Sequence, residues 1–199
     1  EEGLEDNRQG KVLIVVDDED RENEGDFIVS GEKITPEIVN FMITHGRGLL
    51  CAPLPRSRCE ELCLAPMAEE NTSLLGTPFT MSVDLRGYGC TTGVSAFDRS
   101  STIKAMVAGN LNPSEFARPG QVFPLYGADN GGLERNGHTD ATLDMTRMAG
   151  MKPGGALVEI LNEVGTMARL TQLGEIVAKF GLKIVSIKDI QEYRKKHNL

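Results

Sequence analysis

Short apolar runs separated by polar segments recur along the whole chain. Residues 11–16 (KVLIVV) and 27–31 (FIVSG) are continuous apolar runs of the length typical of buried strands. Similar runs predict four further strands, at residues 48–54, 122–127, 155–161 and 182–187. The segment at residues 78–87 (PFTMSVDLRG) alternates apolar and polar residues, which is typical of a half-buried strand.

Helical patterns lie between these strands, and two of them carry boundary signals. Residues 34–46 begin with Thr35 as a helix cap and Pro36 at the first helical position, and they end at Gly46. A second helix is expected to begin at Ser95, because Asp98 follows three residues later as in a capping box. Further helices are predicted at residues 55–64, 138–151, 171–181 and 188–196.

This mixture of strands and helices predicts the fold class. We expect an α+β fold, a mixed β-sheet sandwich with helices packed around it and a βαβ-like C-terminal part. The 199 residues, of which 40% are hydrophobic, suffice for one sizeable core. No repeat or long linker divides them, so we predict a single domain over residues 1–199.

Charge and hydropathy exclude several kinds of partner. The net charge of −8 and the lack of a Lys/Arg-rich run argue against binding to a nucleic-acid backbone. No apolar stretch approaches the roughly 18 residues of a membrane span, and the acidic start (EEGLEDNRQG) is unlike a signal peptide. We therefore expect a cytoplasmic protein that binds neither nucleic acid nor membrane.

The cysteines do not predict a metal or disulfide framework. Cys59 and Cys63 share one helical face, but no CxxC and no fitting histidine pair completes a zinc site. The cysteines, Cys90 included, are therefore interpreted as structural or bystander thiols. Cys51 is the candidate exception, because it ends a likely strand.

The most unusual segment is the acidic loop at residues 17–26 (DDEDRENEGD), which joins the first two strands. A charge run of this kind is most often a solvated turn. A calcium loop is excluded, because Gly31 occupies the position where an EF-hand has its bidentate Glu. The remaining alternative is a catalytic metal site, in which some carboxylates bind Mg²⁺, others transfer protons, and Arg21 binds an anion.

A sugar-phosphate site would also need an anion-binding element, and residues 133–144 (LERNGHTDATLD) provide a candidate. Gly137 and Thr139 lie at the start of a predicted helix, whose free N–H groups attract anions. Arg135 precedes them with a guanidinium suited to phosphate. His138 is either a capping residue or a functional one, for example a metal ligand.

Two further features are open to more than one interpretation. The segment at residues 89–93 (GCTTG) is either a weaker anion site or an ordinary turn before a helix. Glu159 interrupts an apolar strand, so it either faces water or lies in a cleft as a general base; the pattern alone favours the exposed position.

Six ordered motifs resemble one family from about residue 5 onward. They are DDEDRENEGDFI, NTSLLGTPFTMSVD, GCTTGVSAFDRSSTI, ARPGQVFPL, ERNGHTDATLDMTRMAG and VEILNEVGTMAR, and they are similar to 3,4-dihydroxy-2-butanone-4-phosphate synthase of riboflavin biosynthesis. The resemblance implies a lyase that converts D-ribulose 5-phosphate to L-3,4-dihydroxy-2-butanone 4-phosphate and formate, through an enediolate and a skeletal rearrangement. It also implies Mg²⁺ or Mn²⁺, two ions per active site, and a homodimer with active sites near the subunit interface.

The resemblance also implies roles for individual residues. Glu22 and His138 would be metal ligands, and Glu159, Glu24 and Gln121 would be catalytic. The substrate would be bound by Arg21, Glu22, Asp26, Thr92, Arg135, Asn136, Gly137, His138, Thr139 and Glu159.

One residue departs from the family pattern. Family members usually read RPGH where this chain reads RPGQ, so Gln121 replaces a histidine. Glutamine forms similar hydrogen bonds but does not titrate near neutral pH. The alternative function is therefore a catalytically impaired relative that binds sugar phosphate and metal without efficient turnover.

Overall fold

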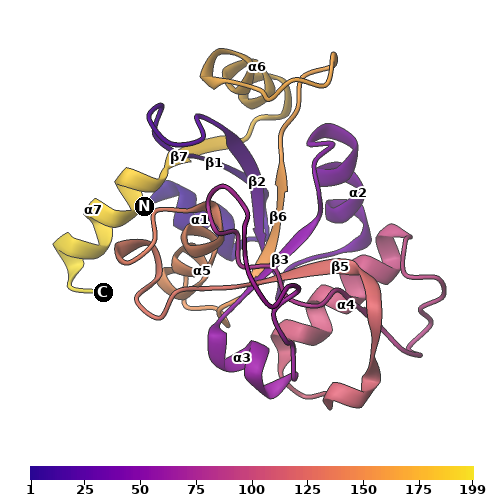
Figure 1. The fold of residues 1–199 in the computed structure, drawn as a ribbon. Coiled ribbons are helices and arrows are strands. Elements are labelled where there is room, and N and C mark those ends of the chain that lie inside the picture. Colours follow the sequence, from indigo (N-terminus) through magenta and orange to yellow (C-terminus); the bar gives the residue numbers. More distant parts are fainter.

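The computed structural model describes residues 1–199 and has one seven-stranded mixed sheet with helices on both faces (Figure 1). The strand order is β4 (Val83–Leu85), β5 (Phe116–Tyr126), β3 (Cys51–Leu54), β6 (Gly155–Glu159), β2 (Gly25–Ser30), β1 (Leu13–Val16) and β7 (Lys183–Ser186). β2 pairs antiparallel with both β1 and β6, whereas β3 is parallel to β5 and β7 is parallel to β1. The predicted α+β class with a mixed sheet is confirmed.

The helices divide between the two faces of this sheet. They are α1 (Glu2–Arg8), α2 (Pro36–His45), α3 (Arg56–Glu61), α4 (Ala96–Ala108), α5 (His138–Met148), α6 (Leu170–Phe180) and α7 (Ile187–His197). In Figure 1, α1, α5 and α7 lie on one side of the sheet, and α2 and α4 lie on the other. None of these helices has the length and apolar character that crossing a membrane requires.

Both faces of the central strands are buried because their side chains alternate between two cores. Ile14 and Phe27 point into the larger core, with side chains of α2, α3, α4 and α6. Leu13 and Ile28, one residue along each strand, point into the smaller core with α1, α5 and α7. The same alternation places Asp26 and Glu159 on the α5 side of the sheet.

The helices predicted from capping signals begin where those signals lie. Thr35 Oγ1 accepts a hydrogen bond from the N–H of Ile38 (3.3 Å), and Ser95 Oγ accepts one from the N–H of Asp98 (3.0 Å). Each cap satisfies an N–H group that the first helical turn leaves free.

Two elements differ from the sequence-based expectation. α1 was not expected, because EGLEDNR has no apolar period; it packs on the smaller core mainly through Leu4. β4 has only three residues instead of the predicted ten-residue strand, since its ladder with β5 is interrupted between Val83 and Asp84. In the C-terminal part, β6, α6 and β7 form the expected βαβ-like succession with parallel strands, but β7 pairs with β1, so that β2 and β1 separate it from β6.

Candidate functional site

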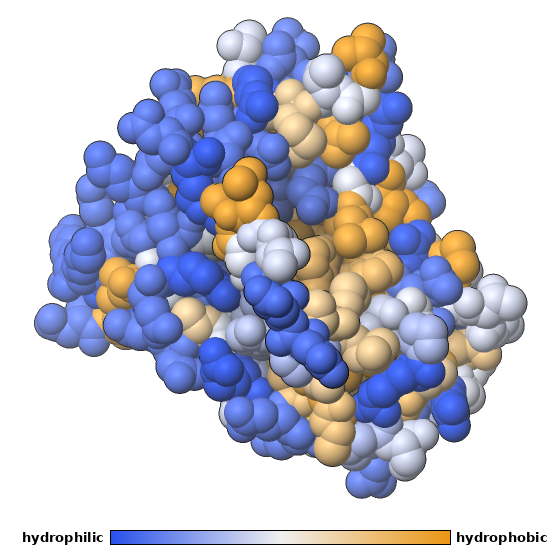
Figure 2. Space-filling model, viewed as in Figure 1, coloured by the Kyte–Doolittle hydropathy of each residue, from blue (hydrophilic) through white to orange (hydrophobic).

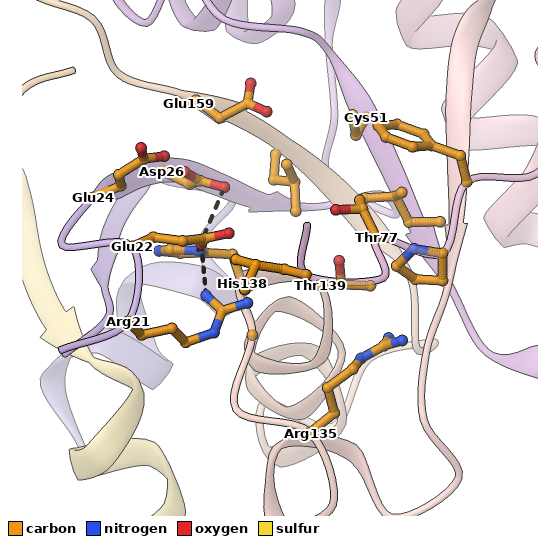
Figure 3. A pocket seen from close by; sticks show the side chains of 16 residues that line it. Arg21, Glu22, Glu24, Asp26, Cys51, Thr77, Arg135, His138, Thr139 and Glu159 are labelled. Atoms are coloured by element: carbon orange, nitrogen blue, oxygen red, sulfur yellow. Dashed lines mark hydrogen bonds and ion pairs between the residues drawn. The ribbon is translucent and has the colours of Figure 1, made fainter. Parts of the chain in front are cut away.

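A pocket of about 120 Å³ opens where the acidic loop, the N-terminus of α5 and the ends of β2 and β6 meet (Figure 3). Residues 75–79 border it from another side. Most of the predicted site residues line this pocket: Arg21, Glu22, Glu24, Asp26, Arg135, Gly137, His138, Thr139 and Glu159. Segments that are far apart in the sequence therefore converge on one place.

The carboxylate of Asp17 organises the acidic loop from within. Its two oxygens accept hydrogen bonds from the backbone N–H groups of Glu22 and Glu24, each at 2.9 Å. Asp17 Oδ2 also pairs with Arg21 Nη1 at 3.0 Å, and the Asp17 side chain is fully buried. The loop is thus an ordered turn around the buried charge of Asp17, and its other carboxylates take no part in these backbone hydrogen bonds.

Glu22, Asp26 and His138 form a charged cluster in the pocket. His138 Nδ1 lies 3.3 Å from Glu22 Oε2 and 4.0 Å from Asp26 Oδ2. Arg21 Nη1 donates to the same Glu22 oxygen at 2.6 Å (Figure 3). His138 is the first residue of α5, yet its ring contacts the acidic loop and caps nothing, so the capping alternative is wrong.

Burial and neighbouring charges shift the pKa values of this cluster. Burial raises the pKa of Asp26 to about 7, and the charges of Glu159, Glu22 and Glu24 act in the same direction against the opposing effect of His138. Burial lowers the pKa of His138, but Asp26, Glu22 and Asp17 outweigh it and raise this pKa to about 9. The hydrogen bond to His138 holds the pKa of Glu22 below its usual range. The imidazolium and the surrounding carboxylates therefore stabilise each other.

The same cluster has the donor set that a divalent cation requires. Ligand atoms of Asp17, Glu22 and His138 all lie within 4.8 Å of one another. His138 Nε2 and Asp26 Oδ1 are buried without a hydrogen-bond partner, so two polar atoms are left for a ligand. Carboxylate oxygens with one imidazole suit Mg²⁺ or Mn²⁺. Since both Asp17 oxygens already accept backbone hydrogen bonds, Glu22 and His138 are the better candidate ligands.

Arg135 is held beside the N-terminus of α5 by a buried carboxylate. Its Nε donates to Asp140 Oδ2 (2.6 Å) and its Nη2 donates to Asp140 Oδ1 (3.2 Å) and to the carbonyl of Tyr126 (2.9 Å). Nη1 has no acceptor in the protein and remains free for a ligand. Together with the unpaired N–H groups at the start of α5, it forms a site suited to a phosphate group.

Glu159 ends β6 at the opposite wall of the pocket. Its Oε2 accepts a hydrogen bond from the N–H of Leu49 at 2.8 Å, which fixes the direction of the carboxylate. Gly48 makes this approach possible, because a Cβ there would lie 2.4 Å from Oε2 and 2.6 Å from the Glu159 carbonyl oxygen. Glu159 is half-buried and lines the pocket, so the expectation of a water-facing strand residue is wrong.

Three predicted site residues do not line this pocket: Thr92, Gln121 and Asn136. Thr92 and Gln121 are exposed, and both lie near Asp84, which accepts a hydrogen bond from the N–H of Gln121 (2.7 Å) and would contact a Cβ at Gly93. The 89–93 segment is fixed by hydrogen bonds to Asp98 in the first turn of α4, the helix that follows it. Asp98 accepts from Thr91 Oγ1 (3.0 Å) and from the N–H of Gly93 (3.0 Å). Its structure is that of an ordinary turn and cap.

The structure also adds residues that the sequence did not single out for the site. Asp17 was one of many acidic residues, and only its backbone contacts distinguish it. Thr77 enters the pocket from the 75–79 segment, which carried no chemical signal of its own. Cys51 begins β3 and lies in the pocket wall, where burial raises the pKa of its thiol well above its usual value. It is therefore protonated and a poor nucleophile.

Comparison with known sequences gives one consistent family. The model of the family described as 3,4-dihydroxy-2-butanone 4-phosphate synthase matches residues 1–193. The chain is 57% identical over 194 residues to the riboflavin biosynthesis protein RibBA of Parabacteroides distasonis, and 51% identical over 195 residues to RibBA of Aquifex aeolicus. In both comparisons 98% of this chain aligns with 48% of the relative, so the chain spans about half the length of these relatives.

Solved structures agree with the sequence comparison. A 3,4-dihydroxy-2-butanone 4-phosphate synthase in complex with two magnesium ions superposes with a TM-score of 0.94 at 34% identity, covering 98% of this chain and 96% of that one. RibBX, a two-domain synthase from A. baumannii, gives a TM-score of 0.92 at 44% identity, covering 97% of this chain and 56% of that one. By sequence, fold and pocket, the chain belongs to the 3,4-dihydroxy-2-butanone 4-phosphate synthase family.

Proposed function

We propose that this chain converts D-ribulose 5-phosphate to L-3,4-dihydroxy-2-butanone 4-phosphate and formate, a lyase reaction of riboflavin biosynthesis. The observation that carries the proposal is the pocket itself. It combines a cluster fit for a divalent cation, a free guanidinium at a helix N-terminus, and a separate carboxylate, Glu159, on the opposite wall. A phosphorylated sugar needs each of these groups.

Glu22 and His138 are the proposed metal ligands. The related structure in complex with two magnesium ions supports Mg²⁺ as the metal, and we extend the proposal to Mn²⁺ and to two ions in each active site of this chain. When bound, such ions would polarise the carbonyl and hydroxyl oxygens of the sugar and stabilise negative charge that develops there. The role of the acidic loop is to hold Glu22 in place, with the Arg21 guanidinium compensating the negative charges of Asp17 and Glu22.

The phosphate end of the substrate is assigned to the turn before α5. Arg135 would donate from Nη1, and the free N–H groups of the first turn of α5, which begins at His138, would donate beside it. Gly137 and Asn136 shape this turn. Asn136 acts indirectly, since its side-chain oxygen accepts from Gln191 (3.4 Å) and the residue does not line the pocket.

Proton transfer is assigned to carboxylates at the sugar end. Glu159 is oriented by the N–H of Leu49 and is the proposed essential acid/base. Glu24 is a second candidate, because burial and the charge of Glu22 raise its pKa. Asp26, whose pKa is raised to about 7, would bind a substrate hydroxyl as either donor or acceptor.

Formate release from ribulose 5-phosphate with Mg²⁺ tests the proposal. The unaltered chain should release formate and Glu159→Ala should not. Glu163→Ala is the matched control, because Glu163 is exposed in the loop that follows β6. Absence of formate from the unaltered chain and from Gln121→His would contradict the proposed activity.

The second candidate function is a relative that binds sugar phosphate and metal with little turnover. The observation that favours it is Gln121, whose side chain cannot move a proton at neutral pH. If the replaced histidine carries a proton, Gln121→His should release formate much faster than the unaltered chain. If it only positions the substrate, the two rates should be similar.

We also propose that the chain forms a homodimer whose partner contributes to the site. Thr92 and Gln121, which the family resemblance assigns to the active site, are exposed outside this chain's own pocket. Val94 and Phe97 beside them are exposed apolar residues. Figure 2 shows hydrophobic residues gathered at the centre and right of one face, which a second subunit would cover.

Subunit mixing tests this arrangement. Glu159→Gln and Gln121→Ala would each be inactive alone, and their mixture would recover formate release because one site in a mixed dimer has both residues. Light scattering should give twice the monomer mass. A single synthase domain over residues 1–199 and a cytoplasmic location remain predictions.

A further inference from the structure

Residues 18–24 of the acidic loop have no apolar side chain. A cavity of about 60 Å³ lies beneath it, bordered by loop residues and by the first turn of α6. Close packing occurs at the end of the loop, where Gly25 meets Leu173 so tightly that a Cβ would lie 2.5 Å from Leu173 Cδ1. The conformation of residues 18–24 therefore depends on polar contacts.

Beside backbone hydrogen bonds within the loop and the ion pairs of Arg21, two opposite charges bind the loop backbone from its two sides. Asp17 binds the N–H groups of Glu22 and Glu24 from within. Arg169, the residue before α6, binds the loop from outside: its Nη1 donates to the carbonyl oxygens of Glu22 (2.9 Å) and of Asn23. Asp17 thus binds the Arg21–Glu22 and Asn23–Glu24 peptide groups, and Arg169 binds the Glu22–Asn23 and Asn23–Glu24 peptide groups. The Asn23–Glu24 peptide is held by a carboxylate on one side and by a guanidinium on the other.

The backbone at this point needs external support. Asn23 has φ of 55°, in the left-handed region that asparagine adopts more readily than other non-glycine residues but that still costs more than ordinary backbone conformations. Asp18, Glu19, Asp20, Glu22 and Glu24 also repel one another. Conformations of this kind persist when surrounding contacts fix them, and the Arg169 contacts are at the left-handed residue Asn23 and at Glu22 itself.

Arg169 is itself placed by the strand that carries Glu159. After β6 the chain makes a short hairpin, with the Leu161–Met167 bridge, and Ala168 N–H donates to the Ile160 carbonyl (2.9 Å). Arg169 N–H then donates to Gln172 Oε1 (3.0 Å) at the start of α6. The hairpin therefore links the strand of Glu159 to the loop of Glu22, on opposite sides of the pocket.

We propose that Arg169 is a positioning residue that holds the acidic loop so that Glu22 faces the metal site. The expected effect on metal affinity rests on the proposed metal-binding function. The contacts of Arg169 with the loop backbone are present in the metal-free chain. Arg169 is exposed and touches no lining residue through its guanidinium except the backbone of Glu22. Its removal should disturb the loop and leave the core intact.

The test compares Arg169→Gln with Arg47→Gln. Arg47 is the matched control, because it is also exposed and its Nη1 donates to a backbone carbonyl of the same hairpin, Asn162 (2.6 Å), without touching the acidic loop. In metal-free protein, hydrogen exchange at the N–H groups of Glu22 and Glu24 should accelerate in Arg169→Gln alone. Mn²⁺ affinity, measured by titration, should fall about 10- to 100-fold, as for other residues that support metal ligands.

Further outcomes separate this inference from the proposed function. Arg169→Lys should recover part of the Mn²⁺ affinity, because an ammonium can donate to the same carbonyls, and it replaces Arg169→Gln if that variant unfolds. Unchanged exchange and unchanged Mn²⁺ affinity in Arg169→Gln would overturn the inference. If the unaltered chain bound no Mn²⁺, the metal-binding proposal would fail, and the exchange measurement alone would decide whether Arg169 fixes the loop.

Discussion

Asp26 and Glu159 are direct partners in the antiparallel pairing of β2 with β6, so two carboxylates face each other on the same side of the sheet. Like charges in such a pair destabilise a sheet. The charge of Glu159 accordingly contributes to raising the pKa of Asp26, after the larger effect of burial. The pair has an energetic cost for folding, which a catalytic use would explain.

Glu159→Gln should separate stability from activity. The amide keeps an acceptor for the N–H of Leu49 while removing the negative charge, so the free energy of unfolding should stay equal or rise by up to about 1 kcal/mol. Formate release should fall about 10²- to 10⁴-fold, the usual contribution of an acid/base group. Urea unfolding and formate assays measure the two effects, and Glu163→Gln should change neither. Strong destabilisation by Glu159→Gln would show that the carboxylate is mainly structural.

The cluster around His138 predicts how the stability of the metal-free protein depends on pH. Its pKa is raised from 6.5 to about 9, so the folded state binds more protons than the unfolded state between these values. The stabilisation is complete below pH 6.5 and is lost as pH rises toward 9, by an amount on the order of 3 kcal/mol.

Urea unfolding in a chelator at several pH values measures this dependence. His138→Gln should reduce the decrease, because the amide does not titrate. Added Mg²⁺ should stabilise the unaltered protein more strongly as pH rises, since metal binding requires the neutral imidazole. A free energy of unfolding that rises from pH 6.5 to 9 in the chelator would contradict the assignment.

Asp140→Asn should weaken substrate binding more than turnover. The asparagine amide has one acceptor oxygen where Asp140 offers two, so Arg135 loses part of its support. The KM for ribulose 5-phosphate should rise about 10- to 100-fold, the effect of losing a hydrogen bond to a charged group, with a smaller change in kcat. Asp129→Asn is the control, because Asp129 is exposed and pairs with Arg56 at 3.7 Å. An unchanged KM would indicate that Arg135 does not bind the phosphate.

Arg194→Met should destabilise the protein without a direct effect on the pocket. Arg194 Nη1 donates to Asp144 Oδ2 (3.0 Å) and to the carbonyl of Asn130 (2.8 Å), which joins α7 to α5 and to the turn before it. Removing the guanidinium leaves the buried Asp144 carboxylate with weaker charge compensation. The free energy of unfolding should fall by about 3 to 5 kcal/mol. Adding Asp144→Asn should restore part of this loss, because the amide oxygen still accepts from Gly132 N–H. Thermal and urea unfolding provide the measurement.

The predictability of the fold depended on whether a signal was local. Thr35 and Ser95 cap their helices through contacts three residues away, and the sequence contains both partners. α1 has no such signal; only the neighbouring helices and strands make its one large apolar residue, Leu4, part of the core. The length of β4 depends on β5, whose register shifts at Val83, and no local pattern contains that information.

The candidate site follows the same rule. The acidic loop and the RNGHT turn, residues 135–139, are each one continuous segment of the sequence, so their residues could be predicted from the sequence. Most of the predicted site residues then meet in one pocket. Asp17 could not be distinguished from its acidic neighbours, because its role comes from turning inward to bind two backbone N–H groups. Thr92 and Gln121 were named only through resemblance, and the fold of one chain leaves them exposed.

The alternation of side chains along β2 and β6 also determines where this chain can accept extra residues. A one-residue insertion in β2 would reverse the direction of every following side chain, so that Asp26 and Phe27 would exchange faces. Pocket and core would then be lost together. Insertions at the exposed hairpin turn, residues 163–166, would shift neither strand. Length variation among functional descendants of this sequence should therefore collect in such turns and be absent from β2.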